Sequence, residues 1–223
     1  KQKGSLVLLD ACQSLAHQKI DVIDLGIDFL AGSGHKLCGP TGIGFLWSKK
    51  EILEKIPPLF GGGEMIQDVF EESSTWAELP HKFEAGTPAI AEAIGLAAAI
   101  NYINNIGLDH IHEYEKTITK YLFEKLNQIE DIEIIGPPPE IDPKRASLAT
   151  FYVKKIHSND IAEILDSKGI CIRSGHHCCQ PLHRNLGVNS TARISMNFTT
   201  NKDDIDIFIE KLQETINFLK INS

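Results

Sequence analysis

A lysine among small residues follows the apolar segment 27–31, in the sequence Gly-Ser-Gly-His-Lys at 32–36. Small residues let a ligand approach the backbone, and open α/β sheets bind ligands at the carboxyl ends of their strands. A lysine held in a dry pocket loses some of its proton affinity, and it can then form a Schiff base with an aldehyde cofactor or a carbonyl substrate. Lys36 is therefore a candidate for covalent chemistry, with a solvated loop lysine as the alternative.

A carboxylate and a carboxamide follow the preceding apolar segment, at Asp10 and Gln13. They stand three residues apart, so in a strand-to-loop turn both side chains can face one bound ring. A carboxylate that faces a pyridine nitrogen keeps that nitrogen protonated, which makes the ring an electron sink. From the residues alone, the alternative is a helix N-cap aspartate beside a surface glutamine.

Two histidines and two cysteines stand together at 176–179, shortly after Arg173. Adjacent residues rarely converge on one metal ion, and no second Cys/His pair has zinc spacing, so we do not expect a structural metal here. Arg173, His176 and His177 can instead favour the thiolate form of a reactive cysteine in a mobile loop. A buried structural cysteine is the alternative.

An arginine interrupts the apolar segment 192–196, at Arg193. An inward arginine on an apolar strand generally has an anionic partner, and bidentate carboxylate binding suits its geometry best. The alternative is an outward arginine on an edge strand.

The elements that position these residues fall into two parts. Short apolar segments at 6–9, 27–31 and 42–47 predict buried strands of a sheet covered on both faces. The Gly- and Pro-rich segment 57–86 predicts a long, functional loop. From Pro88 onward strands and helices alternate, as in an α/β or α+β unit. The helices are expected near 90–103, 109–128, 158–168 and 203–219, and the strands at 132–135, 147–153, 170–173 and 192–196. The break near 105–108 is the best candidate for a domain boundary.

Composition and motifs exclude several classes of protein. The 223 residues carry 22 Lys and Arg against 30 Asp and Glu, and a net charge of -8 argues against nucleic acid or anionic lipid as the main partner. No apolar run reaches the roughly 18 residues of a membrane helix. Five cysteines without C-x-x-C spacing favour a reducing compartment. The glycine-rich segment 39–44 precedes a strand rather than a helix, so it does not predict a nucleotide site.

In order and spacing, these motifs resemble the C-terminal portion of a Suf-type (group II) cysteine desulfurase, a pyridoxal-phosphate enzyme of the class V aminotransferase group. The resemblance covers essentially the whole chain. It rests on D-A-C-Q at 10–13, S-G-H-K at 33–36, G-P-T-G-I-G at 39–44, G-G-G-E-M-I at 61–66, F-E-A-G-T-P at 83–88, R-S-G-H-H-C at 173–178 and A-R-I-S at 192–195.

The resemblance implies a role for each matched residue. Lys36 would form the Schiff base with pyridoxal 5'-phosphate, and Cys178 would attack the sulfur of L-cysteine and carry away a persulfide, leaving L-alanine. The cofactor's pyridine nitrogen, 3-oxygen and phosphate would be bound by Asp10, by Gln13, and by Ser33 and His35, respectively. Arg193, with Arg173 nearby, would bind the substrate carboxylate. Cys179 stands where we expect another residue type, and we expect it to be dispensable.

The resemblance also implies a fold and an assembly. The fold would be fold type I, aspartate-aminotransferase-like. Residues 1–105 would form the C-terminal part of the large cofactor-binding domain, and residues 106–223 the small α+β domain. Thr87 would reach the phosphate of the neighbouring subunit, which implies a homodimer. The family's N-terminal half, with its phosphate-binding loop and ring-stacking histidine, is absent. Since the chain also starts without Met, we expect it to be a fragment.

The resemblance implies sulfur supply for iron–sulfur cluster assembly through a Suf acceptor protein, in the cytoplasm or, in a photosynthetic eukaryote, the plastid stroma. A selenocysteine lyase, a cysteine sulfinate desulfinase and a non-catalytic truncated paralogue stay open.

Overall fold

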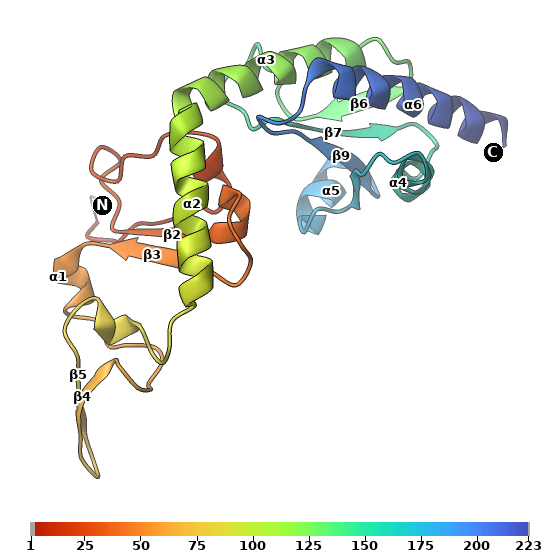
Figure 1. Ribbon diagram of the computed structural model, residues 1–223. Coiled ribbons are helices and arrows are strands. Elements are labelled where there is room, and N and C mark those ends of the chain that lie inside the picture. Colours follow the sequence, from red (N-terminus) through yellow and green to blue (C-terminus); the bar gives the residue numbers. More distant parts are fainter. Residues whose placement is uncertain (1–2, 223) are drawn as a thin grey trace. The chain divides into compact units, whose positions relative to one another are not determined.

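The computed structural model describes residues 3–222, which divide into two compact units, one ending at His110 and the other beginning at Ile111 (Figure 1). The break lies close to the one expected from the sequence. The assignment of the two parts to a large and a small domain stays a prediction.

The first unit contains a three-stranded sheet in the order β1-β2-β3, formed by Leu8–Asp10, Phe29–Ser33 and Gly44–Ser48. β1 and β2 are parallel, and β2 and β3 are antiparallel. All three expected strands are confirmed, although each begins two residues later than its apolar segment. The remaining elements of this unit are α1 (Lys50–Leu53), the hairpin of β4 (Ile66–Val69) and β5 (Ser74–Trp76), α2 (Ile90–Ile106), and single-turn helices at Ser14–Ala16, Gly34–Leu37 and His81–Phe83.

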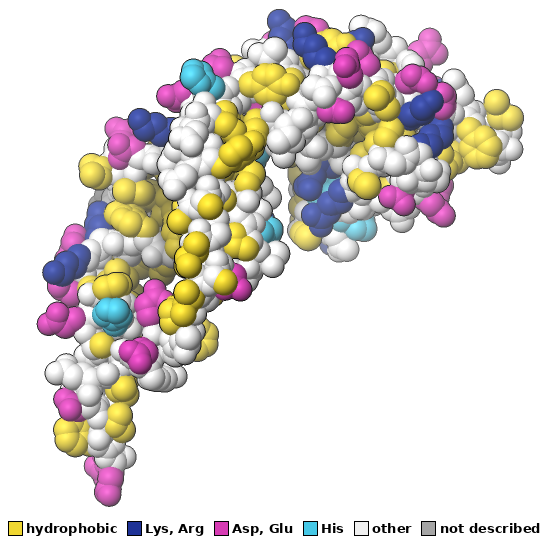
Figure 2. Space-filling view, viewed as in Figure 1, with side chains coloured by type: hydrophobic (Ala, Val, Ile, Leu, Met, Phe, Trp, Pro, Cys, Tyr) yellow, Lys and Arg dark blue, Asp and Glu magenta, His cyan; other side chains and the backbone are white. Residues whose placement is uncertain are grey.

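Two expectations for the first unit are wrong. The segment 57–86 is not entirely loop, because β4 and β5 pair within it. The sheet is also not covered on both faces, since Leu8 is 59% exposed and Leu46 57% exposed. Figure 2 shows further hydrophobic side chains on the surface along α2. The apolar segments therefore predicted the positions of the strands correctly, but they did not predict how exposed the strand side chains are in this unit.

The second unit is a four-stranded antiparallel sheet, and three of its helices pack on one face. Its sheet order is β6-β7-β9-β8, formed by Ile132–Ile135, Leu148–Val153, Thr191–Ser195 and Arg173–Gly175. The helices are α3 (Leu108–Leu126), which begins at the end of the first unit, α4 (Ser158–Ser167), α5 (Gln180–Leu186) and α6 (Lys202–Ile221). The three that pack on one face of the sheet are α3, α4 and α6. The expected strand at 170–173 is wrong in all but Arg173, and α5 was not expected.

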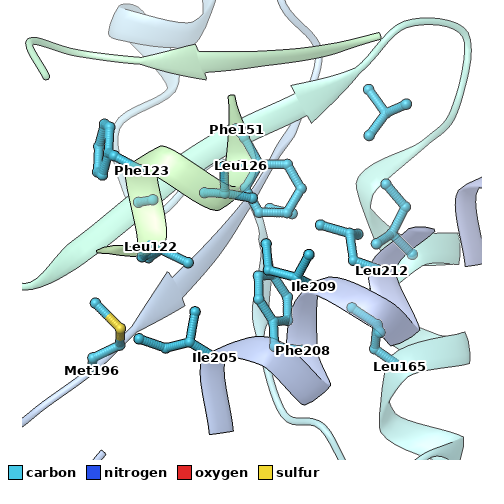
Figure 3. Close-up of a cluster of buried hydrophobic side chains, with 14 of the residues drawn as sticks. Leu122, Phe123, Leu126, Phe151, Leu165, Met196, Ile205, Phe208, Ile209 and Leu212 are labelled. Carbon is cyan, nitrogen blue, oxygen red and sulfur yellow. The ribbon is translucent and has the colours of Figure 1, made fainter. Parts of the chain in front are cut away.

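The core of the second unit follows the two-residue period of β7. Ala149, Phe151 and Val153 are buried, whereas Thr150 and Tyr152 between them are only half-buried. Successive side chains of a strand point to opposite faces, so the buried set marks the face that the helices cover. Figure 3 shows this cluster, in which Leu122 and Leu126 of α3, Leu165 of α4, and Ile205, Phe208 and Leu212 of α6 surround Phe151.

Candidate functional site

The carboxyl ends of β1 and β2 bring together residues that are far apart in the sequence. Parallel pairing places Asp10 opposite Ala31, two residues before Ser33. The next turn, Gly34–Leu37, carries His35 and Lys36. The charge of Lys36 contributes to the lowered pKa of Asp10, after the hydrogen bonds from Cys12, so the ammonium and the carboxylate share one electrostatic environment. The strand-end rule therefore placed these groups correctly at one edge of the sheet.

Asp10 is held as a carboxylate by Cys12. The Cys12 amide donates to Asp10 Oδ1 over 3.0 Å. Hydrogen bonds from the Cys12 side chain and amide lower the pKa of Asp10, and the same side-chain contact raises the pKa of the Cys12 thiol. The N-cap of the following turn is Gln13, which is exposed, so the expectation of Asp10 as a helix N-cap is wrong. Asp10 is thus a fixed anion that can face a cationic group.

Ser33 and His35 form a pair at the same edge, with Ser33 Oγ 3.1 Å from His35 Nδ1. His35 is exposed, and Ser33 and Lys36 are half-buried. A hydroxyl, an imidazole and an ammonium on one turn can together bind an anionic group such as a phosphate.

The glycines of this segment serve packing between strands. A Cβ on Gly32 would lie 2.4 Å from Cζ of Phe45, and one on Gly34 would lie 2.8 Å from the Ile43 carbonyl oxygen. Real Cβ atoms essentially never show contacts this short, so Gly34 needs to be glycine beside the backbone of Ile43, whereas a side chain on Gly32 would require the Phe45 ring to move. The expected reason, close approach of a ligand, is not required to explain them.

Thr87 lies elsewhere in the first unit, on the exposed loop between Phe83 and α2. The Gly86 amide donates to the Gly63 carbonyl over 2.9 Å, and Gly86 has a φ of 80°. This bond ties the loop to the triple-glycine segment 61–63 and presents Thr87 at the surface.

In the second unit, two arginines stand opposite each other in the sheet. The register of β8 and β9 pairs Arg173 directly with Arg193. Opposed residues of an antiparallel pair share a face, so the two guanidinium groups lie on the face away from Ala192 and the core. β9 lies between β7 and β8, so Arg193 is not on an edge strand, but its side chain lies on the face away from the core rather than inward as expected. Arg193 Nε is buried and has no hydrogen-bond partner within residues 3–222.

Cys178 lies on a turn beside these arginines. Its Sγ is 3.4 Å from Arg173 Nη2, and the residue is exposed, which rules out a buried structural cysteine. The turn borders a hollow of about 490 Å³ lined by Arg173, Ser174, His176, His177, Cys178, Gln180 and Pro181. An exposed thiol in contact with a guanidinium has the setting of a reactive cysteine.

His177 does not supply the expected positive charge. Burial, followed by the nearby charges of Arg193 and Arg173, lowers the pKa of His177, so its imidazole is neutral at neutral pH. The cation in contact with Cys178 is therefore Arg173. No group of three or more His, Cys, Asp or Glu within residues 3–222 is arranged to hold a metal ion.

The sequence reasoning missed one residue of this site. His183, on α5, is buried and contacts the turn that carries Cys178. Pro181 near the start of α5 is a helix-start signal that could have predicted the helix and placed His183 one turn after Cys179.

The sequence pattern of the aminotransferase class-V family matches residues 1–208. The chain belongs to this family. The mixed α/β architecture of the chain agrees with this family. The chain is similar to a solved structure, the apo cysteine desulfurase from Thermococcus onnurineus, with a TM-score of 0.90 and 39% sequence identity. The match covers 97% of this chain and 54% of the Thermococcus chain.

Curated class-V relatives agree with that similarity. A probable cysteine desulfurase from Synechocystis is 53% identical over 97% of this chain and 51% of its own length. One from Staphylococcus aureus is 47% identical over 97% of this chain and 52% of its own length. The chain thus spans about half the length of the curated relatives it matches. No helix within residues 3–222 is long and apolar enough to cross a membrane.

Proposed function

We propose that this chain belongs to a pyridoxal-phosphate-dependent cysteine desulfurase, which converts L-cysteine to L-alanine and leaves a persulfide on Cys178. The observation that carries the proposal is the exposed Cys178 thiol in contact with Arg173, beside the paired Arg193. One fold can support many reactions, so the fold alone does not identify the activity. Desulfuration requires a reactive thiol close to groups that bind the substrate carboxylate, and Cys178 beside Arg173 and Arg193 meets this requirement. The names of the relatives support the same activity.

The donors at the β1–β2 edge fit pyridoxal 5'-phosphate. Asp10, a carboxylate with a lowered pKa, suits a protonated pyridine nitrogen, and Gln13 suits the ring's 3-oxygen. The Ser33–His35 pair suits the phosphate, and Lys36 suits the aldehyde carbon. When bound, this cofactor withdraws electrons from the substrate's Cα.

The remaining steps belong to side chains of this chain. Arg193, whose buried Nε has no partner within residues 3–222, would bind the substrate carboxylate together with Arg173. Lys36 would remove the Cα proton and return it to Cα, and Cβ would take a second proton from solvent. The Cys178 thiolate would bond to the substrate sulfur while the Cβ–S bond breaks and its electron pair stays with carbon. The products are alanine and the Cys178 persulfide.

Cys178→Ser in the full-length gene product tests the assignment. The hydroxyl is a far poorer nucleophile toward sulfur, so persulfide formation should fall by roughly a thousandfold or more, whereas the visible cofactor band should stay. Cys179→Ser is the matched control and should remain close to wild type. Alkylation after one turnover followed by mass spectrometry locates the persulfide, and an adduct on Cys179, Cys12 or Cys38 in place of Cys178 would overturn the mechanism.

Substrate tests separate the alternatives. Full activity of Cys178→Ser on cysteine would contradict a persulfide on Cys178. Wild-type activity on selenocysteine or cysteine sulfinate, without activity on cysteine, would identify a related lyase. A protein that binds no cofactor would be a non-catalytic paralogue.

We further propose a homodimer in which Thr87 reaches the cofactor phosphate of the neighbouring subunit. Support comes from the exposed position of Thr87 on a loop fixed by the Gly86–Gly63 bond. Thr87→Ala should lower cofactor affinity, because a hydroxyl donor to phosphate is lost. Mixing this variant with Lys36→Ala should restore one intact site in each mixed dimer, measured as recovered turnover. Mixed dimers with no recovered site would indicate a site built within one chain.

We propose a sulfur-acceptor protein of the Suf system as the partner that receives the persulfide for iron–sulfur cluster assembly. The exposure of Cys178 supports transfer to another protein. The five free thiols among the described residues suit a reducing compartment such as the cytoplasm or the plastid stroma.

A further inference from the structure

His183 is a buried histidine that the proposed mechanism does not use. It lies in α5 and is 4% exposed. Its Nδ1 is 3.2 Å from the Cys179 carbonyl oxygen, and its Nε2 is 3.0 Å from Thr191 Oγ1. The ring therefore joins the turn that follows Cys178 to the first residue of β9, the strand that carries Arg193.

The partners fix which nitrogen carries the hydrogen. A carbonyl oxygen can only accept, so His183 Nδ1 donates to Cys179. The other nitrogen of the neutral ring is then an acceptor, and the Thr191 hydroxyl donates to it. Both polar atoms of this buried side chain are thus satisfied, one by the turn and one by the sheet.

The turn that the ring contacts has an unusual backbone. His177 has a φ of 49° and Cys178 a φ of 63°, the left-handed region that side chains other than glycine rarely adopt. Such conformations persist only where the surroundings hold them. The rings of His176 and His177 pack against the His183 ring, with centroids 5.4 Å and 6.0 Å away.

We infer that His183 is a positioning residue that holds the turn 176–179 in the shape that presents the Cys178 thiol to Arg173. The Cys179 carbonyl already accepts from the His183 amide over 3.3 Å, and the bond from Nδ1 is a second hold on the end of the turn immediately after Cys178. Without the Nδ1 bond the two left-handed residues are held less firmly, and the contact of 3.4 Å between sulfur and guanidinium is weakened. The role of Cys178 as nucleophile rests on the proposed function, whereas the effect of His183 on the thiol does not.

Two substitutions separate the two ring nitrogens. The amide nitrogen of an asparagine lies near the position of Nδ1, so His183→Asn keeps a donor for the Cys179 carbonyl and gives up the bond to Thr191. The carboxamide of a glutamine lies near Nε2, so His183→Gln keeps the link to Thr191 and gives up the bond to the turn. Leu182→Ala, at an exposed position of the same helix, is the control for general perturbation of α5.

The measurement is the rate at which iodoacetamide alkylates Cys178 at pH 7.5 in the full-length holoprotein without substrate, followed by peptide mass spectrometry. His183→Gln should slow this alkylation roughly fivefold to tenfold, the effect of losing one hydrogen bond that holds the thiolate setting. His183→Asn and Leu182→Ala should stay within about twofold of wild type, since both keep the anchor.

Two results would overturn the inference: a wild-type rate for His183→Gln, or a rate for His183→Asn as slow as that expected of His183→Gln. Should His183→Gln fail to fold, the rate of His183→Asn decides alone. The alkylation needs no turnover, so these results are independent of whether the protein is a desulfurase. That question is answered by the product assay on Cys178→Ser.

Discussion

The two units differ in how they bury their apolar residues. In the second unit one continuous cluster joins β7, β9 and three helices, with Leu122, Phe151 and Leu212 fully enclosed. In the first unit the cluster around Leu30 is small, and many large apolar side chains are exposed. The most exposed of them are Leu59, Ile23, Phe60 and Ile94. Many large exposed apolar side chains are typical of a surface that contacts another protein segment, so we expect the first unit to make contacts beyond its own residues.

This difference indicates how firmly each unit holds its proposed catalytic residue, Cys178 in the second unit and Lys36 in the first. The Cys178 turn is attached to a sheet with its own core, through His183 and Thr191. The Lys36 edge lies on a sheet of three short strands, and exposed apolar residues flank it. We therefore expect the contact between Cys178 and Arg173 to form independently of the β1–β2 edge that carries Lys36. We expect that edge, in contrast, to need additional protein around it for stability.

The largest expected effect tests that independence. Lys36→Ala in the full-length gene product should abolish the visible cofactor band, because the amine that holds the aldehyde is gone. The alkylation rate of Cys178 should not change, since the contact with Arg173 lies in the other unit. Borohydride reduction of the wild-type protein should fix the cofactor on Lys36, and a label on Lys49 or Lys50 instead would sink the assignment.

A smaller effect concerns the core. Residues 111–223 expressed alone should unfold cooperatively in urea, and Phe151→Ala should lower the free energy of unfolding by about 3–5 kcal/mol, because it opens a cavity among fully buried side chains. The exposed Leu186→Ala is the control and should change it by less than about 0.5 kcal/mol. Residues 1–110 alone should bind apolar dyes without a cooperative transition. Cooperative unfolding of that fragment would remove the contrast between the units.

The smallest expected effect is a pH dependence within the second unit. Hydrogen bonds from Lys211 and Lys168 lower the pKa of Glu214 to about 2. Because the pKa of Glu214 is lower in the folded protein, its ionised carboxylate stabilises the fold at pH values above 4.5, the ordinary pKa of a glutamate. This contribution is lost as the pH falls through about 2. In Glu214→Gln, the free energy of unfolding of residues 111–223, measured in urea, should therefore decrease less between pH 4.5 and about 2 than it does in the wild type. These ion pairs of Glu214 are exposed, so 1 M salt should remove the difference in stability between the two proteins. If stability depends on pH identically in both proteins at low salt, the ion pairs contribute nothing.

Sequence reasoning succeeded where local pattern decides structure. The strand at 132–135 was predicted with the observed bounds, and the expected helix at 203–219 is extended only slightly in α6. An asparagine–aspartate capping box at Asn201 and Asp204 fixes the start of that helix. The positions of Asp10 and Lys36 after apolar segments placed each at a strand end, and the parallel pairing of β1 and β2 brings the two ends to one edge.

Sequence reasoning failed where pairing decides structure. The apolar residues Ile170 and Ile172 predicted a strand, but the backbone that pairs with β9 begins at Arg173. The juxtaposition of Arg173 and Arg193 depends on that register, which no local pattern encodes. The short helix α5 and its buried His183 were missed because seven residues with only two leucines give too little periodic pattern to distinguish a helix from a loop.

The register of β8 and β9 decides where this sheet can accept extra residues. A slip of one residue would turn Arg173 from its present face toward the helices, and the His183 bridge spans the segment 176–190 that would have to absorb the change. The connection between β6 and β7 is closed at its base by Arg145, whose guanidinium donates to the Pro137 and Leu148 carbonyls, whereas its tip at Ile141 is 75% exposed. We therefore expect a peptide tag or a small reporter domain inserted next to Ile141 to be tolerated, whereas a residue inserted between Arg173 and Cys178 should separate the thiol from its guanidinium.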